Sequence, residues 1–179
     1  MEEMTQAGPN LPVFYRKKYP EDRLSDFVAF FWELKNHSGR ELRTEILPDG
    51  YFDIIFTKSS GDYFRAFISG MQTKSVSYTI PANCHTFAIS FKLPAISFFP
   101  ELSVLDLTNK NRELPQRFLD IDFTGDETLE SFAVKISSVL KNRIPAKVDQ
   151  QILRLCREIY TTNGGKKMEE YAESIQDRK

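Results

Sequence analysis

The order of apolar and polar residues predicts a β-rich first half and a helical end. In the segment 27–35 both alternating sets of side chains are mostly apolar, with Val28, Phe30, Trp32 and Leu34 on one face and Phe27, Ala29, Phe31 and Glu33 on the other. Such a strand is expected inside a sheet that is covered on both faces. Further short strands, separated by turn sequences, are expected at 12–18, 42–47, 51–57, 63–69, 75–80 and 86–92. This pattern predicts a sandwich or a small barrel.

After residue 93 the periodicity changes from that of strands to that of helices. A short helix is expected between Pro94 and Pro100, and a longer one after the capping-box pattern Thr124-x-x-Glu127. The longer helix carries an apolar stripe at helical spacing, formed by Leu129, Phe132, Ile136 and Leu140. Self-association is expected through this stripe or through the opposite face, with Ala133, Val134 and Val139. Alternatively, the helix only covers the open side of the barrel.

The segment 148–179 predicts a helix, a tight turn and a second helix. Apolar residues recur at helical spacing from Val148 to Tyr160, and Asn163-Gly164-Gly165 is expected to end the first helix. The spacing repeats from Met168 to Ile175. This arrangement is typical of the opening of a helix-turn-helix DNA-binding domain, whose base-reading helix would begin beyond Lys179.

The composition is typical of a globular protein, and the net charge gives no overall electrostatic field that would attract nucleic acid or anionic membranes. Hydrophobic residues make up 41% of the 179 residues, charged residues 27%, and the net charge is −1. Cys84 and Cys156 lie far apart, so we expect no disulfide in a reducing compartment. No signal peptide is recognisable, and the longest apolar stretch, 27–32, is too short to span a membrane. We therefore expect a cytoplasmic protein without a membrane partner.

The sequence offers little material for catalysis or metal binding. His37 and His85 are its two histidines, and neither belongs to a pair with metal-ligand spacing. Cys84 and His85 are adjacent in a predicted strand, so they point to opposite faces and cannot easily form a nucleophile and base. No motif of a hydrolase, a P-loop or a dinucleotide fold is present. We therefore expect no enzyme activity, no catalytic residue, no metal and no cofactor.

The candidate binding residues come from two regions. In the strands they are Trp32, Glu33, Phe31 and Phe56. The rings of Phe27, Phe31, Phe52 and Phe56 could line the inside of a barrel with room for a small apolar ligand. A buried Glu33 must be paired or have its pKa raised. It is either a ligand-binding acid or a strand-end carboxylate held by a backbone amide or by Arg43. Near the C-terminus, Lys166 and Lys167 are candidates for contacts with DNA phosphates.

Several motifs occur in an order similar to that in the N-terminal sensor domain of one subgroup of AraC-type transcriptional regulators. They are Trp32-Glu33-Leu34, Ile46-Leu47-Pro48-Asp49-Gly50, Phe52-Asp53-Ile54-Ile55-Phe56, Ser69-Gly70 and Ile89-Ser90-Phe91-Lys92-Leu93-Pro94-Ala95. The segment from Ile159 to Ile175 resembles the first part of the AraC-type DNA-binding domain. The chain departs from the family in lacking a glycine around 93–95 and in its residues 176–179, which do not align with the family's Ser and Arg.

The resemblance implies an α+β protein with a cupin-like small β-barrel or sandwich, followed by a C-terminal helical segment. The expected parts are a sensor domain at 1–112, a linker with the dimerisation helix at 113–146, and the first two helices of a truncated DNA-binding domain at 147–179. Within the last part, 148–162 would be the first helix and 166–176 the scaffold helix of the first motif, with Ala172 allowing a close helix crossing.

The expected function is that of a transcriptional regulator whose sensing and dimerisation region is present and whose DNA-reading region is incomplete. A small-molecule effector, of unknown identity, would shift the population of two arrangements of a homodimer. DNA would be bound only through the complete form, so we expect no sequence-specific DNA binding by this chain alone. The rivals are a stand-alone binding module that antagonises a full-length regulator, and a cupin-type enzyme, which would need converging histidines and carboxylates.

Overall fold

The structure is a computed structural model that describes residues 12–59, 64–115, 118–121, 123 and 127–176. The chain forms mostly strands up to Leu114 and mostly α-helices after it. The strands are β1 (Val13–Lys18), β2 (Val28–Asn36), β3 (Leu42–Ile46), β4 (Phe52–Lys58), β5 (Arg65–Ser69), β6 (Val76–Ile80), β7 (Cys84–Phe91) and β8 (Asn111–Leu114). The helices are the 3-10 segments η1 (Asp22–Asp26) and η2 (Leu93–Phe98), and the α-helices α1 (Val104–Leu107), α2 (Leu129–Lys141), α3 (Gln150–Thr161) and α4 (Met168–Gln176).

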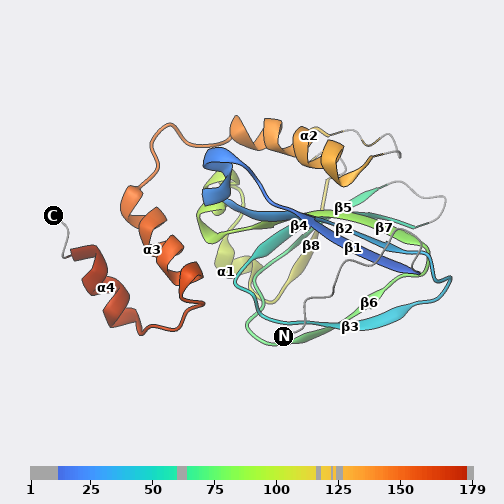
Figure 1. Ribbon diagram of the computed structural model, residues 1–179, viewed down its shortest axis with the longest axis horizontal. Coiled ribbons are helices and arrows are strands. Elements are labelled where there is room, and N and C mark those ends of the chain that lie inside the picture. Colours follow the sequence, from blue (N-terminus) through green and yellow to red (C-terminus); the bar gives the residue numbers. More distant parts are fainter. Residues whose placement is uncertain (1–11, 60–63, 116–117, 122, 124–126, 177–179) are drawn as a thin grey trace.

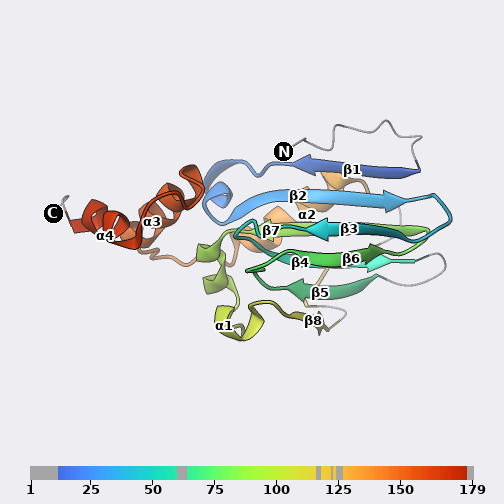
Figure 2. The same cartoon turned by 90° about the horizontal axis from the view of Figure 1, so that it is seen from below.

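Two antiparallel sheets and one helix form three layers. The larger sheet has six strands in the order β1-β2-β7-β4-β5-β8, and β3 pairs with β6 in a second sheet. The β3–β6 pair lies over β7 and β4 on one face of the larger sheet (Figure 2). Helix α2 lies across the opposite face (Figure 1). The larger sheet is therefore covered on both sides, as the apolar faces of the segment 27–35 predict.

The central strand β7 sorts its side chains by size between the two faces. Phe87, Ile89 and Phe91 point toward α2 and are fully buried. The alternating positions toward β3 and β6 carry smaller side chains, namely Cys84, Thr86, Ala88 and Ser90. Because successive strand residues point to opposite faces, one face of β7 is filled with bulky groups and the other is not.

Helix α2 closes the bulky face of the sheet with the predicted apolar stripe. Leu129, Phe132, Ile136 and Leu140 are all buried, and the Phe132 ring stacks on Phe87 with 4.9 Å between centroids. The helix starts later than expected: Thr128 is the N-cap and forms a capping box with Ser131. Thr124 lies outside the described residues. The stripe packs on the sheet, so it is not the surface through which two copies could associate.

A β-bulge in β2 alters the predicted faces of this strand. Val28 pairs with Phe91, whereas Phe30 pairs with the next residue back, Ser90, so Ala29 is the extra residue. The bulge moves Val28 to the α2 face together with Phe31. Sequence alternation alone assigns Val28 to the same face as Trp32, and this assignment is wrong.

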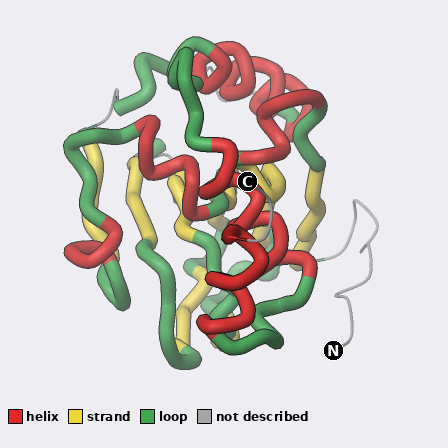
Figure 3. The backbone as a smooth tube through the Cα atoms, turned by 90° about the vertical axis from the view of Figure 1, so that its left-hand side faces the viewer, coloured by secondary structure: helices red, strands yellow, loops and turns green. Residues whose placement is uncertain are grey.

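The helices α3 and α4 form a separate pair at one end of the sandwich (Figures 1 and 3). Asp149 caps α3 by accepting from the backbone amides of Gln151 and Ile152. At its other end, Asn163 and Gly164 adopt positive φ angles of 50° and 68°, as expected for a left-handed helix terminus. The predicted helix, turn and helix are therefore confirmed.

The α+β class is confirmed, but the barrel is not. In the described part of the chain the strands form two sheets and no closed barrel. Strand β8 was not predicted; it pairs with β5 and crosses the expected domain boundary at 112/113. The three-part domain division itself stays a prediction. None of the described helices is both long and apolar enough to cross a membrane.

Gly70, which follows β5, provides a test of the packing between the sheet and α1. A Cβ atom on Gly70 would lie 1.8 Å from the carbonyl oxygen of Leu107, a backbone atom that cannot rotate away. We expect Gly70→Ala to lower the free energy of unfolding by about 3 kcal/mol in urea denaturation. Gly39→Ala is the control, since it places a Cβ in open space at a φ of +71° and should cost only about 1 kcal/mol. Equal losses in the two variants would contradict this account.

Candidate functional site

A cavity of about 270 Å³ lies between the larger sheet and the β3–β6 pair. It exists on the face of β7 that carries the smaller side chains. Aromatic residues line much of it, namely Tyr15 of β1, Phe30 and Trp32 of β2, Tyr51 just before β4 and Tyr78 of β6. Tyr78 and Ile46 are more than two-fifths exposed, so the cavity opens to solvent on the β3–β6 side. An apolar cavity of ~150 Å³ can hold benzene, so this one has room for a small substituted ring.

A row of polar side chains crosses the floor of the cavity. Ser90 of β7 pairs with Asp53 of β4, Asp53 pairs with Ser69 of β5, and Ser69 pairs with Asn111 of β8. Residues directly opposite one another in antiparallel strands point to the same face. All four side chains line the cavity. The floor therefore offers several hydrogen-bonding groups in one line beside the aromatic wall.

Asp53 is the one charged residue in this row. Its Oδ1 atom is buried and has no hydrogen-bond partner. Burial raises the pKa of Asp53 to about 7, although hydrogen bonding with Ser90 and Trp32 acts in the opposite direction. The indole Nε1 of Trp32 donates to Ser90 Oγ at 3.2 Å. A buried carboxyl oxygen without a donor is energetically costly, which marks it as a position where a ligand could donate.

Two opposite charges lie nearer the solvent. Lys17 is exposed, and its Nζ lies 4.0 Å from the centroid of the Phe30 ring, a cation–π distance. Asp49 is exposed as well, and its Oδ1 accepts from the backbone amide of Tyr51 at 3.0 Å. The sequence treats Asp49 only as a turn residue, and the structure adds that it borders the cavity.

The cavity wall directly contacts the terminal helices. Tyr51 lines the cavity and its ring stacks on that of Tyr160 in α3, with 5.3 Å between centroids and 14° between planes. The Tyr160 hydroxyl donates to the Gly50 carbonyl at 3.0 Å and accepts from the Leu93 amide at 2.9 Å. A bidentate pair between Arg157 and Asp26 adds a second attachment of α3.

Of the four predicted ligand residues, Trp32 alone lines this cavity. Phe31 and Phe56 point to the other face of the sheet, where they are buried around Phe132 with centroid distances of 6.3 and 6.0 Å. They therefore do not line this cavity, although Phe31 lines the groove beside α2, and a ligand contact by either residue stays a prediction. The alternation of β2 and β4 could not reveal this, since both faces of each strand are apolar.

Glu33 is on the α2 face too, and it is fully engaged in ion pairs. Its side chain is 0% exposed, and it accepts from Arg16 Nε at 2.6 Å and contacts Lys35 Nζ and His85 Nε2 at 2.8 Å each. Burial disfavours its charge, but the hydrogen bonds with His85, Lys35 and Arg16 prevail and lower the pKa of Glu33 to about 2. Glu33 is thus a carboxylate held by basic side chains, as in the second of the two predicted roles, but its partners are Arg16, Lys35 and His85 and not Arg43.

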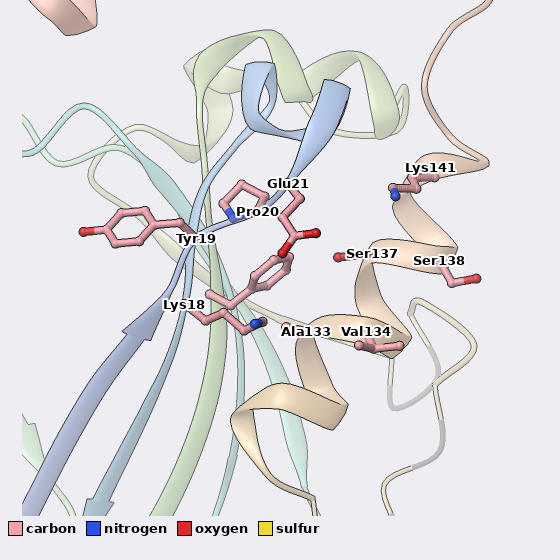
Figure 4. A pocket seen from close by; sticks show the side chains of 10 residues that line it. Lys18, Tyr19, Pro20, Glu21, Ala133, Val134, Ser137, Ser138 and Lys141 are labelled. Atoms are coloured by element: carbon pink, nitrogen blue, oxygen red, sulfur yellow. The ribbon is translucent and has the colours of Figure 1, made fainter.

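The predicted dimerisation residues of α2 differ in exposure. Ala133 is buried and Val139 packs partly against the core, whereas Val134 is 67% exposed. Val134 borders a groove of about 420 Å³ between α2 and the segment that follows β1. Figure 4 shows this groove, with Lys18, Pro20 and Glu21 on one side and Ser137, Ser138 and Lys141 on the other.

The candidate phosphate ligands lie in the turn before α4. Lys166 and Lys167 are both exposed, and Lys166 Nζ forms an ion pair with Glu158 of α3. Tyr171 is buried, and its hydroxyl lies 2.7 Å from Thr162 Oγ1. Ala172 is exposed on α4. A phosphate contact by either lysine stays a prediction.

Sequence reasoning missed Asp53, Tyr51 and Tyr160 as site residues. A signal for Asp53 exists: it is a lone carboxylate in the apolar strand Phe52-Asp53-Ile54-Ile55-Phe56, on the same face as Ile55. Tyr51 and Tyr160 are far apart in the sequence, so their contact follows only from the fold. As predicted, Cys84 and His85 point to opposite faces, Cys84 into the cavity and His85 toward Glu33. Across the described positions, no three His, Cys, Asp or Glu side chains converge on a possible metal site.

Comparison with known proteins gives one match. A family model described as a domain of unknown function (DUF6597) matches residues 16–113, which is more than half of the chain. The match runs from β1 into β8, so it covers every residue that lines the cavity except Tyr15, but neither α2 nor the terminal helices. Searches among curated proteins and among solved structures found no match.

The ion pairs of Glu33 predict a pH-dependent contribution to stability. Because its pKa is lowered from 4.5 to about 2, this contribution is complete above pH 4.5 and is lost as the pH falls toward 2. We expect Glu33→Gln to lower the free energy of unfolding by about 3 kcal/mol at pH 7, measured by urea denaturation, with a smaller loss at pH 3.

The control for this prediction is Glu113→Gln. Glu113 pairs with Arg65 on the surface, where the two side chains are 55% and 63% exposed, so its loss should cost less than ~1 kcal/mol. If Glu33→Gln is no more harmful than this control, the Glu33 ion pairs do not stabilise the sheet.

Proposed function

The chain belongs to the DUF6597 family, and we propose that it is the effector-sensing and dimerisation region of an AraC-like transcriptional regulator. In this proposal the sheet and the β3–β6 pair form a cupin-like sensor. The cavity between them takes a small-molecule effector, and α3 and α4 are the first two helices of a helix-turn-helix DNA-binding domain. DNA is then bound only through the complete form of that domain.

The observation that carries this proposal is the shared wall between the cavity and α3. Tyr51 lines the cavity on one side and stacks on Tyr160 on the other. A ligand that contacts or displaces the Tyr51 ring therefore acts directly on the surface against which Tyr160 stacks, with no other helix or strand in between. Few arrangements would connect a binding site to an output helix so directly.

The mechanism is a shift between two populations. In one, α3 is held against the sensor by the Tyr51–Tyr160 stack, the two hydrogen bonds of Tyr160, the Arg157–Asp26 pair and the burial of Leu153 in the core. In the other, α3 is released. A ligand changes their ratio only by the difference in its affinity for the two states.

The exposed turn before α4 supports the DNA-binding part of the proposal. Lys166 and Lys167 are accessible there, and phosphate contacts of this kind position a helix-turn-helix domain without reading bases. The ion pair between Lys166 and Glu158 is on the surface, so a phosphate can compete for the lysine at little cost.

For dimerisation we propose a two-fold contact through the groove beside α2. Val134 and Tyr19 line this groove and are 67% and 68% exposed, so a partner that covers them removes apolar surface from water. The groove also carries both signs of charge, since Lys18 and Lys141 are positive and Glu21 is negative. A two-fold interface uses the same patch twice, so it requires such self-complementarity.

Tyr160→Phe tests the attachment of α3. The variant keeps the ring that stacks on Tyr51 but loses both hydrogen bonds of the hydroxyl. At about 1 kcal/mol for each bond, we expect the population with released α3 to rise roughly 30-fold. Hydrogen–deuterium exchange should then be faster across 150–161 but unchanged in β7.

Thr73→Val is the matched control, because it also removes a hydroxyl that makes two hydrogen bonds, here with Asn109 on an exposed turn. It should leave exchange in α3 unchanged. If Tyr160→Phe behaves like this control, α3 is not held through Tyr160 and the proposed route from the cavity to the helix pair fails.

Val134→Glu tests the proposed dimer contact. The added carboxylate would be buried in the proposed contact, close to its symmetry mate in the partner. We therefore expect the dimer dissociation constant, measured by light scattering over a concentration series, to rise about 30-fold or more. Leu105→Glu is the control, since Leu105 is 85% exposed on α1. A wild-type protein that remains monomeric, or a Val134→Glu variant with an unchanged mass, would contradict the proposal.

A further inference from the structure

The charges around the cavity are balanced at its mouth but not at its floor. At the mouth, the exposed Lys17 and Asp49 carry opposite charges and compensate each other. At the floor, Asp53 stands alone among uncharged groups, with the buried Ser90 on one side and Ser69, followed by the exposed Asn111 at the sheet edge, on the other. The deepest part of the cavity is therefore the place for a group that donates hydrogen bonds and carries positive charge.

The orphaned Oδ1 of Asp53 identifies the position of that group. The nearby indole of Trp32 does not supply a donor to this oxygen, and its Nε1 points to Ser90 Oγ. An ammonium has three N–H donors and no acceptor, so it can satisfy Oδ1 and still donate to a neighbouring hydroxyl or amide oxygen. An anion would instead meet a carboxyl group without a compensating cation at this depth.

The wall of the cavity suits the rest of an organic cation. Five aromatic rings line it, and the Lys17 ammonium already lies over the face of Phe30 at 4.0 Å from the centroid. The negative face of an aromatic ring attracts cations, most strongly where water is excluded. A carboxyl group at the floor and ring faces at the sides form a cage for a positively charged nitrogen with an apolar substituent.

We propose that the cavity binds a small organic ammonium ion, whose nitrogen donates to Asp53 Oδ1 and whose apolar part lies against Trp32 and Tyr15. This inference rests on the proposed sensor function, since it names the chemical class of the effector. The volume of about 270 Å³ limits the ligand to about one ring with a short amino-bearing chain.

The test uses three probes of nearly equal shape and different charge on the full chain at pH 7.5. They are benzylamine as the cation, benzyl alcohol as the neutral donor and benzoate as the anion, each titrated by isothermal calorimetry up to about 10 mM. We expect benzylamine to bind at least about tenfold more tightly than benzyl alcohol, and benzoate not to bind.

Asp53→Asn locates the effect, because it keeps the shape of the side chain and removes its charge. We expect it to reduce the affinity for benzylamine by about tenfold or more and to leave that for benzyl alcohol within about twofold. Glu101→Gln, which removes an exposed carboxylate, should change neither affinity. The comparison of the three probes on the wild-type protein needs no variant, so the inference stays testable even if Asp53→Asn folds poorly.

The outcomes separate this inference from the proposed function. Benzyl alcohol binding as tightly as benzylamine, or benzylamine binding unchanged in Asp53→Asn, overturns the ammonium assignment and leaves a sensor for a neutral ligand. Absence of benzylamine binding at about 10 mM overturns the assignment as well. The sensor function fails on a different measurement, namely unchanged hydrogen–deuterium exchange of α3 in Tyr160→Phe.

Discussion

The alternation of large and small side chains along β7 is the constraint on which the site depends. Phe87, Ile89 and Phe91 fill the face under α2, so that face is closed by packing alone. Ser90 and Thr86 on the other face leave room that the short β3–β6 pair does not fill. A bulky apolar residue at either position would fill the cavity and leave a solid sandwich. The cavity is thus a consequence of side-chain size at a few positions of one strand.

Glu33 and Asp53 lie on opposite faces of the same sheet, and their different surroundings give the two carboxylates different roles. Glu33 has three basic partners, and its pKa is lowered to about 2, so its charge is used to hold β1, β2 and β7 together. Asp53 has no basic partner at bonding distance, and burial raises its pKa to about 7. A satisfied carboxylate contributes to the fold, whereas an unsatisfied one is available to a ligand.

The sequence predicted the elements well and the site poorly, for a physical reason. Turn residues and periodicity located seven of the strands and the α3–α4 pair, because these signals are local. Strand β8 escaped because its four residues, Asn111–Leu114, are mostly polar and exposed on a sheet edge. Both faces of the strands that carry Phe31 and Phe56 are apolar, so the sequence could not indicate which face borders the cavity and which lies under α2. The Tyr51–Tyr160 contact joins residues more than a hundred positions apart, and no local pattern encodes it.

Helix α3 is attached to the sandwich by apolar burial and by polar contacts. Leu153 of α3 belongs to the hydrophobic core and Cys156 is buried. A ring stack, two hydrogen bonds and one surface ion pair add about 1 kcal/mol each. Coupling energies between sites are typically about 1–3 kcal/mol, which is the size of the contribution from the Tyr51–Tyr160 stack and the two hydrogen bonds of Tyr160. In the proposed mechanism, a ligand beside Tyr51 acts on this part of the attachment, and the burial of Leu153 sets the resistance that it must overcome.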